Sequence, residues 1–308
     1  MLMEETPCPV CDSQDFRVVF RLPDLAYNCP GIFVLVRCLE CDALYQNPRP
    51  TAAEMETCYP SDYEPFTRDA DRVGSRLQRL RLRPRCRQIS RLARGGRLLD
   101  IGCANGLFLA EMRQYGDWEV FGVEPNPGAA RYARDVLGLP ISHQLKTADL
   151  EGSLDVVTMW DVIEHLHQPA ETLTMVRQLL KPGGWLIVST PNPASLDARL
   201  FRGHWKGLDV PRHTVVLDKR AMRRLLADSG FRLARVYSFY GRHTVFALSL
   251  QLWLKCRYPS IAKHPLTDRV LFLAVWRWLT LPFFLLVEAL GYGSILTYVA
   301  QPEQPSSR

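Results

Sequence analysis

Leu98-Leu99-Asp100-Ile101-Gly102-Cys103-Ala104-Asn105-Gly106 is the stretch that decides the fold of this 308-residue chain. An apolar run leads into an acid and a glycine-flanked turn, and an amphipathic helix is predicted from Leu107. A second apolar run, Trp118 to Val123, ends on Glu124. A strand, a glycine turn, a helix and a second strand ending in an acid are typical of an adenosine site, because glycines admit the ligand to the backbone and the acid takes two ribose hydroxyls.

The turn differs from the fingerprint of dinucleotide-binding folds. That fingerprint needs three glycines, of which the third lets the helix pack closely on the strand. In this chain only Gly102 and Gly106 enclose the turn, with Cys-Ala-Asn between them. The pattern therefore predicts a nucleoside site without a complete turn for a diphosphate.

Beyond the turn, apolar runs alternate with amphipathic segments through most of the chain. Seven runs are predicted to be strands, at residues 98–101, 120–123, 141–143, 154–160, 185–189, 231–239 and 294–300. Such alternation is typical of a parallel sheet covered by helices. The sequence thus predicts an α/β fold with a Rossmann-like, seven-stranded, mostly parallel sheet, with the core at 97–242 and the last strand and tail at 293–308.

Polar residues stand where the predicted strands end. They are Asp100, Glu124, Asp149, Asp161 and the segment 190–192. In parallel sheets the ligand binds outside the carboxyl ends of the strands, so we expect these groups to surround one pocket. Glu124 is the strongest candidate, because an acid at a strand end among apolar residues needs a polar partner.

Two close cysteine pairs lie within residues 1–50. Cys8 and Cys11 form the first pair, and Cys38 and Cys41 form the second. Four thiolates in such knuckles hold zinc tetrahedrally and leave no open position, so the pattern predicts a zinc ribbon with a structural metal. A tetrathiolate iron site is the alternative. Cys29, between the pairs, is expected to pack rather than to bind metal.

The net charge of +6 comes mainly from an arginine-rich stretch, residues 68–97, which overlaps a predicted helical linker at 51–96. Eleven arginines there are opposed only by Asp69 and Asp71. One interpretation is a solvated helical face, and the other is a patch for phosphate on a lipid surface or a substrate. Without aromatic interleaving or a recognisable nucleic-acid module, nucleic acid is not expected as a partner.

An unusually apolar insertion, residues 243–292, precedes the last strand. The run from Val270 to Val287 holds one charge, Arg277, besides Pro282. As a helix it would be about 27 Å long, which approaches the thickness of a bilayer core. A single crossing would separate the last strand from its sheet, so a helical pair that dips into one leaflet fits better. A buried dimerisation element or a lid is the alternative.

The N-terminus and the cysteine usage bear on the compartment. Met1 to Pro9 contains acids and no apolar run, so no signal peptide is predicted. The close cysteine pairs point to metal rather than disulfides, which suits a reducing environment. We expect a cytoplasmic protein, with the insertion at the inner face of the membrane.

From Arg97 to Phe231 the chain resembles the class I S-adenosylmethionine-dependent methyltransferases. The segments Trp160-Asp161-Val162-Ile163-Glu164-His165-Leu166 and Leu180-Lys181-Pro182-Gly183-Gly184-Trp185 stand in their expected order. Together with the cysteine pairs and Asn47-Pro48-Arg49-Pro50, the whole chain resembles a bacterial group of zinc-ribbon methyltransferases, some acting on sugars or lipids.

This resemblance implies roles for individual residues. Gly102, Ala104 and Gly106 would line the methionine and ribose of S-adenosylmethionine, and Asp100 would orient the loop. Glu124 would hold the ribose hydroxyls, Asp149 the adenine amino group, and Asp161 would lie near the methionine end.

Asp161, Glu164 and His165 are spaced i, i+3 and i+4, which would place them on one face of a helix. Quinone-pathway O-methyltransferases have a similar segment, associated in some with a divalent cation. A cation held there would lower the pKa of an acceptor hydroxyl. Helix capping and support of the pocket is the alternative, and it is the one we favour from sequence.

A second polar cluster, residues 204–213, follows the fifth predicted strand, where substrate loops sit in this fold. A methyl acceptor must lose a proton, and histidine suits that task, so His213 is the predicted base or substrate-orienting residue. Arg212 is predicted to grip an anionic group, and His204 and Trp205 to wall the acceptor pocket. His213 and Asp161 are the predicted catalytic residues.

The sequence therefore predicts methyl transfer from S-adenosylmethionine to a small-molecule, lipid-linked or sugar acceptor, with a structural zinc and peripheral membrane contact. A non-catalytic adaptor that uses the ribbon and the basic stretch is one alternative. A nucleotide-dependent oxidoreductase is another, disfavoured by the incomplete glycine pattern. The acceptor and the oligomeric state do not follow from the sequence.

Overall fold

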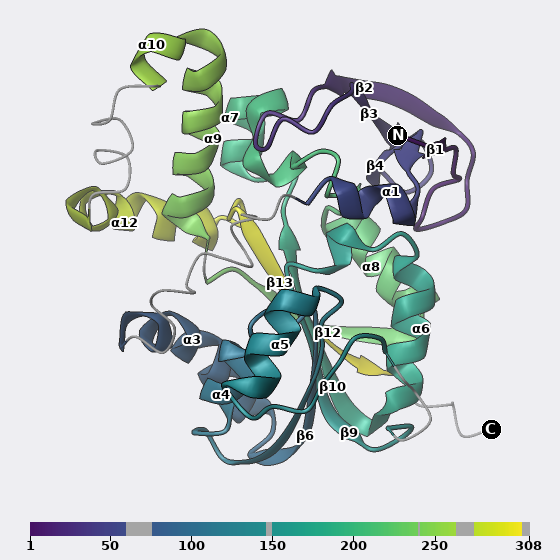
Figure 1. Cartoon of the computed structure of the whole chain (residues 1–308), viewed down its shortest axis with the longest axis vertical. Coiled ribbons are helices and arrows are strands. Elements are labelled where there is room, and N and C mark those ends of the chain that lie inside the picture. The colour runs from purple at the N-terminus through teal and green to yellow at the C-terminus, as the bar shows by residue number, and fades with distance from the viewer. Residues whose placement is uncertain (60–75, 146–149, 240, 263–273, 304–308) are drawn as a thin grey trace.

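A seven-stranded sheet forms the centre of the computed structural model, which describes residues 1–59, 76–145, 150–239, 241–262 and 274–303 (Figure 1). Its strands lie in the order β12-β13-β10-β9-β6-β7-β8. β13 runs antiparallel to both its neighbours, and the other pairs are parallel. The strands are β6 (Gly95–Ile101), β7 (Asp117–Val123), β8 (Ile141–Ser142), β9 (Leu154–Trp160), β10 (Leu180–Pro191), β12 (Phe231–Tyr237) and β13 (Ile295–Pro302). The predicted Rossmann-like, mostly parallel sheet is confirmed.

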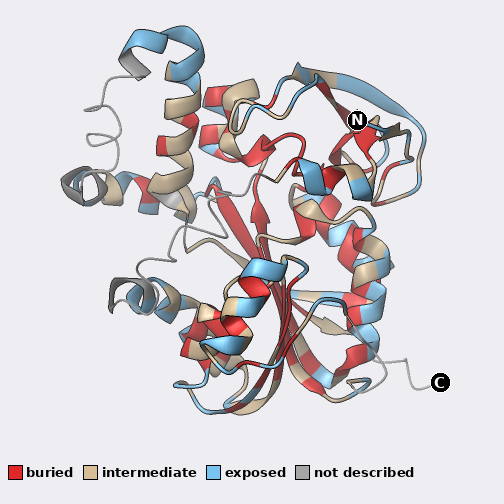
Figure 2. Cartoon of the chain, in the orientation of Figure 1, coloured by how far each residue is buried: buried red, intermediate tan, exposed pale blue. Residues whose placement is uncertain are grey.

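Helices cover both faces of this sheet because successive strand residues point to opposite faces. Leu99 and Val157 pack in one apolar cluster with α6 (Pro169–Leu179) and α8 (Lys219–Asp228). Their neighbours Leu98 and Val156 pack in another with α3 (Arg76–Leu92), α4 (Leu107–Met112) and α5 (Pro127–Asp135). Figure 2 shows the strands buried between exposed helix surfaces. This packing is what holds the carboxyl ends of the strands at one edge.

The N-terminal unit is a second sheet with the order β11-β4-β3-β2. Three of its strands come from the ribbon: β2 (Phe16–Leu22), β3 (Phe33–Cys38) and β4 (Leu44–Gln46). The fourth, β11 (Val215–Val216), comes from the segment after the predicted substrate loop and pairs antiparallel with β4. The ribbon and the core therefore share a sheet. A two-stranded pair, β1 (Met3–Glu4) with β5 (Arg49–Pro50), and the helix α1 (Ala52–Thr57) complete this end of the chain.

Within its described residues, 243–262 and 274–292, the insertion contains the helices α9 (Arg242–Arg257), α10 (Pro259–Ala262) and α12 (Ala274–Ala289) between β12 and β13. α9 packs on α12 through Phe246 and Phe284, whose ring centroids lie 5.7 Å apart. Much of α12 faces solvent, with Trp278 74% and Leu279 67% exposed. Among the described residues, none of the helices has the length and apolar character needed to span a bilayer.

Candidate functional site

The glycine turn between β6 and α4 uses left-handed backbone conformations, which favour glycine. Gly102 and Gly106 have φ of 71° and 77°, in the left-handed region, and Ala104 joins them at 47°. A Cβ on Gly102 would come within 2.5 Å of Val162, so this position excludes a side chain for steric reasons as well. The bend therefore has no room for a side chain at Gly102 or at Gly106, where a Cβ would come within 2.6 Å of Leu139.

Glu124 faces this bend from the end of β7. Its Oε2 accepts a hydrogen bond from the Ala104 amide and its Oε1 one from the Asn126 amide, both at 2.8 Å. Burial raises the pKa of this carboxyl, while the two amide bonds oppose the rise. Each carboxylate oxygen accepts more than one hydrogen bond, so the group keeps acceptor capacity for two hydroxyls.

Asp100, at the end of β6, is buried beneath the bend. The side chain is buried, and Thr158 Oγ1 donates to its Oδ1 at 2.6 Å. Burial raises the pKa of this carboxyl to about 7, although the hydrogen bond from Thr158 opposes the rise. These contacts suit the loop-orienting role that the resemblance implied, which remains a prediction.

Asp161 ends β9 in a left-handed conformation, with φ of 58°. Ser189 Oγ donates to its Oδ1 at 3.3 Å, and Arg85 Nη2 donates to its Oδ2 at 3.4 Å. The Arg85 guanidinium also lies 4.6 Å from the ring centroid of Trp160. Sequence reasoning missed Arg85, because it is one of many arginines and only its place on α3 brings it to this edge.

The predicted helical face of Asp161, Glu164 and His165 was wrong. The left-handed backbone of Asp161 separates it from the short 3-10 turn Ile163–His165. The structure instead brings Glu164 and His165 together with His213, with ligand atoms within 4.8 Å of one another. The cluster thus joins the loop after β9 to the segment before β11.

Both imidazoles of this cluster are oriented by backbone carbonyls. His213 Nδ1 lies 2.9 Å from the Gly207 oxygen, and His165 Nδ1 lies 3.0 Å from the Arg212 oxygen. A carbonyl can only accept, so each ring is a donor at Nδ1 and keeps its lone pair at Nε2. Burial lowers the pKa of His165 to about 3 and also lowers that of His213, although the Asp209 carboxylate opposes both shifts. A lowered pKa favours the neutral ring, the state in which histidine binds metals.

Glu164 is fully buried, and neither carboxylate oxygen has a hydrogen-bond partner within the part of the chain that the structure describes. Burial, followed by the negative charge of Asp161, raises the pKa of Glu164 well above its usual range, although the nearby Thr190 hydroxyl opposes the rise. A buried carboxyl without a partner is costly, and a bound proton or a cation relieves that cost. The donor set of one carboxylate and two neutral imidazoles is therefore suited to a divalent cation.

Arg212 differs from its predicted role, because its guanidinium is fully buried. Its two Nη atoms each donate to Asp24 at 2.8 Å, and Nη2 also donates to Asp209 at 2.9 Å. Although burial opposes ionisation, Arg212 holds the pKa of Asp24 low, and Lys206 and Arg212 hold that of Asp209 low. The guanidinium joins the ribbon to the loop that carries His213 rather than facing a substrate.

Trp205 and His204, predicted to line the acceptor pocket, and Asp149, predicted to contact adenine, are the remaining candidates. Trp205 is buried, donates from Nε1 to Asp197 at 3.0 Å, and packs with Phe33 of the ribbon. His204 is half-buried at the end of a 3-10 turn, Arg202–His204, that follows α7 (Leu196–Phe201). Asp149 lies outside the described residues. The roles predicted for these three residues stay predictions.

The four cysteines of the ribbon converge on one point. The Cys8 and Cys41 sulfurs lie 3.5 Å apart and those of Cys11 and Cys38 lie 3.6 Å apart. All four sulfurs lie within 4.8 Å of one another. A tetrahedron of zinc–sulfur bonds of about 2.3 Å has edges of about 3.8 Å, so the cluster fits a zinc ion.

Comparison with known proteins identifies a family for the central part of the chain. Residues 73–236 match the family described as "Methyltransferase domain". The chain is 36% identical over 129 residues to the ubiquinone biosynthesis O-methyltransferase of Cereibacter sphaeroides, a match of 39% of this chain and 52% of that protein. The corresponding protein of Roseobacter denitrificans is 41% identical over 106 residues, 32% of this chain and 42% of that protein. The chain spans about half the length of these curated relatives.

Solved structures support the fold. A methyltransferase of Thermotoga maritima is 18% identical with a TM-score of 0.50, covering 78% of this chain and 100% of that one. Phosphoethanolamine N-methyltransferase 2 of Haemonchus contortus, solved with S-adenosyl-L-methionine, is 15% identical with a TM-score of 0.51, covering 91% of this chain and 65% of that one. The matched family segment is more than half of the chain, and this protein belongs to the methyltransferase domain family.

Proposed function

We propose that this protein transfers the methyl group of S-adenosylmethionine to a hydroxyl oxygen of a small molecule that carries an apolar tail. The observation that carries the proposal is the hydrogen bond between the Glu124 carboxylate and the Ala104 amide, which places this acid beside the glycine turn. Membership of the methyltransferase domain family supports the reaction class. The relatives named ubiquinone biosynthesis O-methyltransferase support an oxygen acceptor and a small molecule.

The residues at the edge of the sheet fit the cofactor. Glu124 would hold the ribose hydroxyls, and the bend at Gly102 would let the ligand approach the main chain. Arg85 and Asp161 are in contact at 3.4 Å. The Arg85 guanidinium would pair with the carboxylate of the methionine part of the cofactor, and the Asp161 carboxylate with its ammonium group. Bound S-adenosylmethionine supplies an electrophilic methyl on its sulfonium. The chain would contribute the positioning of the two reactants.

Glu124→Ala should weaken S-adenosylmethionine binding by about 100-fold, because two hydrogen bonds to a charged group are lost. Isothermal titration calorimetry with S-adenosylmethionine and with its demethylated product measures the effect. Glu119→Ala is the matched control, since Glu119 lies on the same strand but is exposed. Unchanged affinity in Glu124→Ala would remove the basis of the proposed function.

For the acceptor end, the proposal assigns a divalent cation to Glu164, His165 and His213. The orphaned carboxylate of Glu164 and the two Nε2 lone pairs support this assignment. A bound divalent cation lowers the pKa of a hydroxyl that it contacts. The carbonyls of Arg212 and Gly207 would keep the two imidazoles in the tautomer that such an ion requires.

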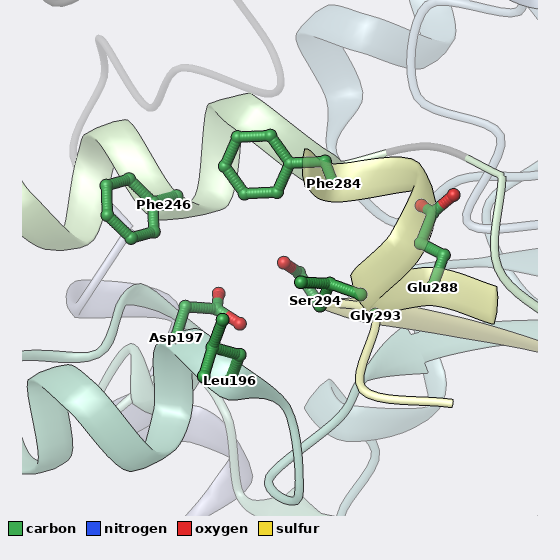
Figure 3. Close-up of a pocket in the computed structure, with 8 residues that line it drawn as sticks. Leu196, Asp197, Phe246, Phe284, Glu288, Gly293 and Ser294 are labelled. Carbon is green, nitrogen blue, oxygen red and sulfur yellow. The ribbon is translucent and has the colours of Figure 1, made fainter. Parts of the chain in front are cut away.

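The insertion supports an apolar acceptor. Figure 3 shows a small cavity where α7, α9 and α12 meet the start of β13, with Phe246, Phe284 and Asp197 among its lining residues. The Asn192 side chain, just past β10, donates to the Gly293 oxygen at 2.9 Å, which links this cavity to the carboxyl edge of the sheet. The exposed apolar face of α12 would rest on the surface of the membrane that holds the acceptor.

Leu279→Asp combined with Leu286→Asp should reduce binding to anionic phospholipid vesicles severalfold, because both side chains are exposed on α12. Vesicle co-sedimentation measures the bound fraction. Val136→Asp is the control, as an equally exposed apolar residue beside α5. Equal sedimentation of the double variant and the wild type would rule out membrane contact through this helix.

The proposal also assigns a structural zinc ion to Cys8, Cys11, Cys38 and Cys41. Purified protein should contain about one zinc per chain, as a closed tetrathiolate site requires. Elemental analysis of the wild type and of Cys38→Ser checks this, with zinc expected to fall in the variant. Cys86→Ser, a buried cysteine of α3, should keep its zinc. Iron in place of zinc would contradict the assignment.

A further inference from the structure

Two cysteines outside the zinc cluster meet where the ribbon joins the core. Cys29 lies between β2 and β3, and Cys58 follows α1. Cys29 Sγ donates to Cys58 Sγ at 2.8 Å, and both are free thiols. We propose that Cys29 and Cys58 form a peroxide-sensitive site that closes reversibly into a disulfide.

Geometry favours this pair over other cysteines. A disulfide bond is about 2.05 Å long, so the two sulfurs need to approach by less than about 1 Å. Cys29 is half-buried and Cys58 is buried, so we expect only a small oxidant to reach the pair. Hydrogen peroxide is small enough for such access, whereas bulky disulfides are not.

The surroundings make Cys58 the nucleophile. Burial, followed by the hydrogen bond to Cys58, raises the pKa of Cys29 to about 12, so Cys29 keeps its proton and donates it toward Cys58, whose own thiol donates to the Glu54 carbonyl at 3.8 Å. Arg212 Nη1 donates to the Cys58 carbonyl at 3.1 Å, which holds the main chain of this residue in place. The hydrogen bond from Cys29 to the Cys58 sulfur favours Cys58 as the attacking cysteine.

The reaction balances with hydrogen peroxide as the oxidant. Cys58 Sγ attacks one peroxide oxygen, the O–O bond breaks, and a sulfenic acid and one water form. Cys29 Sγ then attacks the Cys58 sulfur, the S–S bond forms, and the hydroxyl leaves with a proton as a second water. The two thiols lose two electrons and the peroxide gains them. A dithiol reductant restores both thiols.

The disulfide would tie two segments that both reach the candidate site. The Cys29 amide donates to Asp24, the carboxylate that pairs with Arg212. Tyr59, the residue after Cys58, has its hydroxyl 3.0 Å from Nδ1 of His165. Oxidation would therefore fix the ribbon loop, the end of α1 and the contact of Tyr59 with His165 as one unit. This site stands independently of the proposed methyl transfer.

The test treats full-length, zinc-loaded protein with a hydrogen peroxide series, alkylates the remaining thiols and maps disulfides by mass spectrometry. The Cys29–Cys58 crosslink should appear at a lower dose than any other disulfide and before a chromogenic chelator detects released zinc. Dithiothreitol should remove the crosslink. The thermal midpoint of the oxidised wild type should rise by several degrees, because the crosslink restricts the unfolded chain.

Matched variants decide the outcome. Cys29→Ser should lose the thermal shift and, with a dimedone probe, show a trapped sulfenic acid at Cys58. Cys256→Ser, which removes an exposed cysteine, should keep both the crosslink and the shift. The proposal is overturned if zinc leaves while Cys29 and Cys58 are still alkylated separately, or if another disulfide forms first. Dimedone labelling of other cysteines in Cys29→Ser, with Cys58 unlabelled, would overturn the order of the two steps.

Discussion

Arg212→Met should destabilise the protein by about 3–5 kcal/mol, the largest stability effect expected of a single substitution at this junction. The guanidinium is fully buried between Asp24 and Asp209, and methionine fills most of its volume without its charge. Two carboxylates would then remain buried with one partner fewer. The free energy of unfolding from urea titration, followed by circular dichroism, measures the loss.

Two further variants separate charge from packing. Adding Asp24→Asn to Arg212→Met should recover part of the stability, because one of the stranded charges is gone. Arg220→Met removes an exposed ion pair with Asp42, also between core and ribbon, and should have little effect. A cost for Arg212→Met as small as that for Arg220→Met would show that the buried pair contributes little net stability.

Glu164→Gln should lower the rate of methyl transfer by about 10³-fold, as expected when activation of the acceptor hydroxyl is lost. Glutamine keeps the size of the side chain but cannot supply a negative ligand to a cation. Transfer of labelled methyl to a panel of alkylated phenols measures the rate, and titration with Mn²⁺ measures cation binding. Both should fall together, while S-adenosylmethionine binding stays at the wild-type level.

Glu111→Gln is the matched control, because Glu111 is a buried glutamate on α4 outside the cluster. It should keep the wild-type rate and Mn²⁺ affinity. Full activity of Glu164→Gln after removal of divalent cations would show that no cation acts at this site. A lowered rate with unchanged Mn²⁺ affinity would show that Glu164 supports the reaction without binding a cation.

The sheet could be predicted from sequence because each central strand is a continuous apolar run bounded by turn residues. Helices cover both faces of the strands at Leu98 to Ile101 and Leu154 to Trp160. The apolar composition of these runs is therefore enough to predict that they are buried. β11 could not be found this way. Its two residues, Val215 and Val216, form a strand only because β4 lies beside them.

The candidate site also contains residues that the local sequence places and residues that only the folded chain brings together. Glu124 follows its strand directly, so its place against the bend came from a local pattern. The grouping of Glu164 with His213 depends on how a distant loop returns to the sheet. Arg212 was misassigned because an arginine in a polar loop is ordinarily exposed, and its partner Asp24 is far away in sequence.

The pairing of β11 with β4 has a consequence for how this chain could be rebuilt. Gln46 Nε2 donates to the carbonyls of Pro211 and His213, both at 2.7 Å. The ribbon therefore helps to fix the main chain that carries His213. A ribbon taken from a relative would need a strand edge that pairs with Val215 and Val216, and a side-chain amide at the position of Gln46. We therefore expect a sequence change in the ribbon at this contact to require a matching change in the core, so that neither part can be replaced alone.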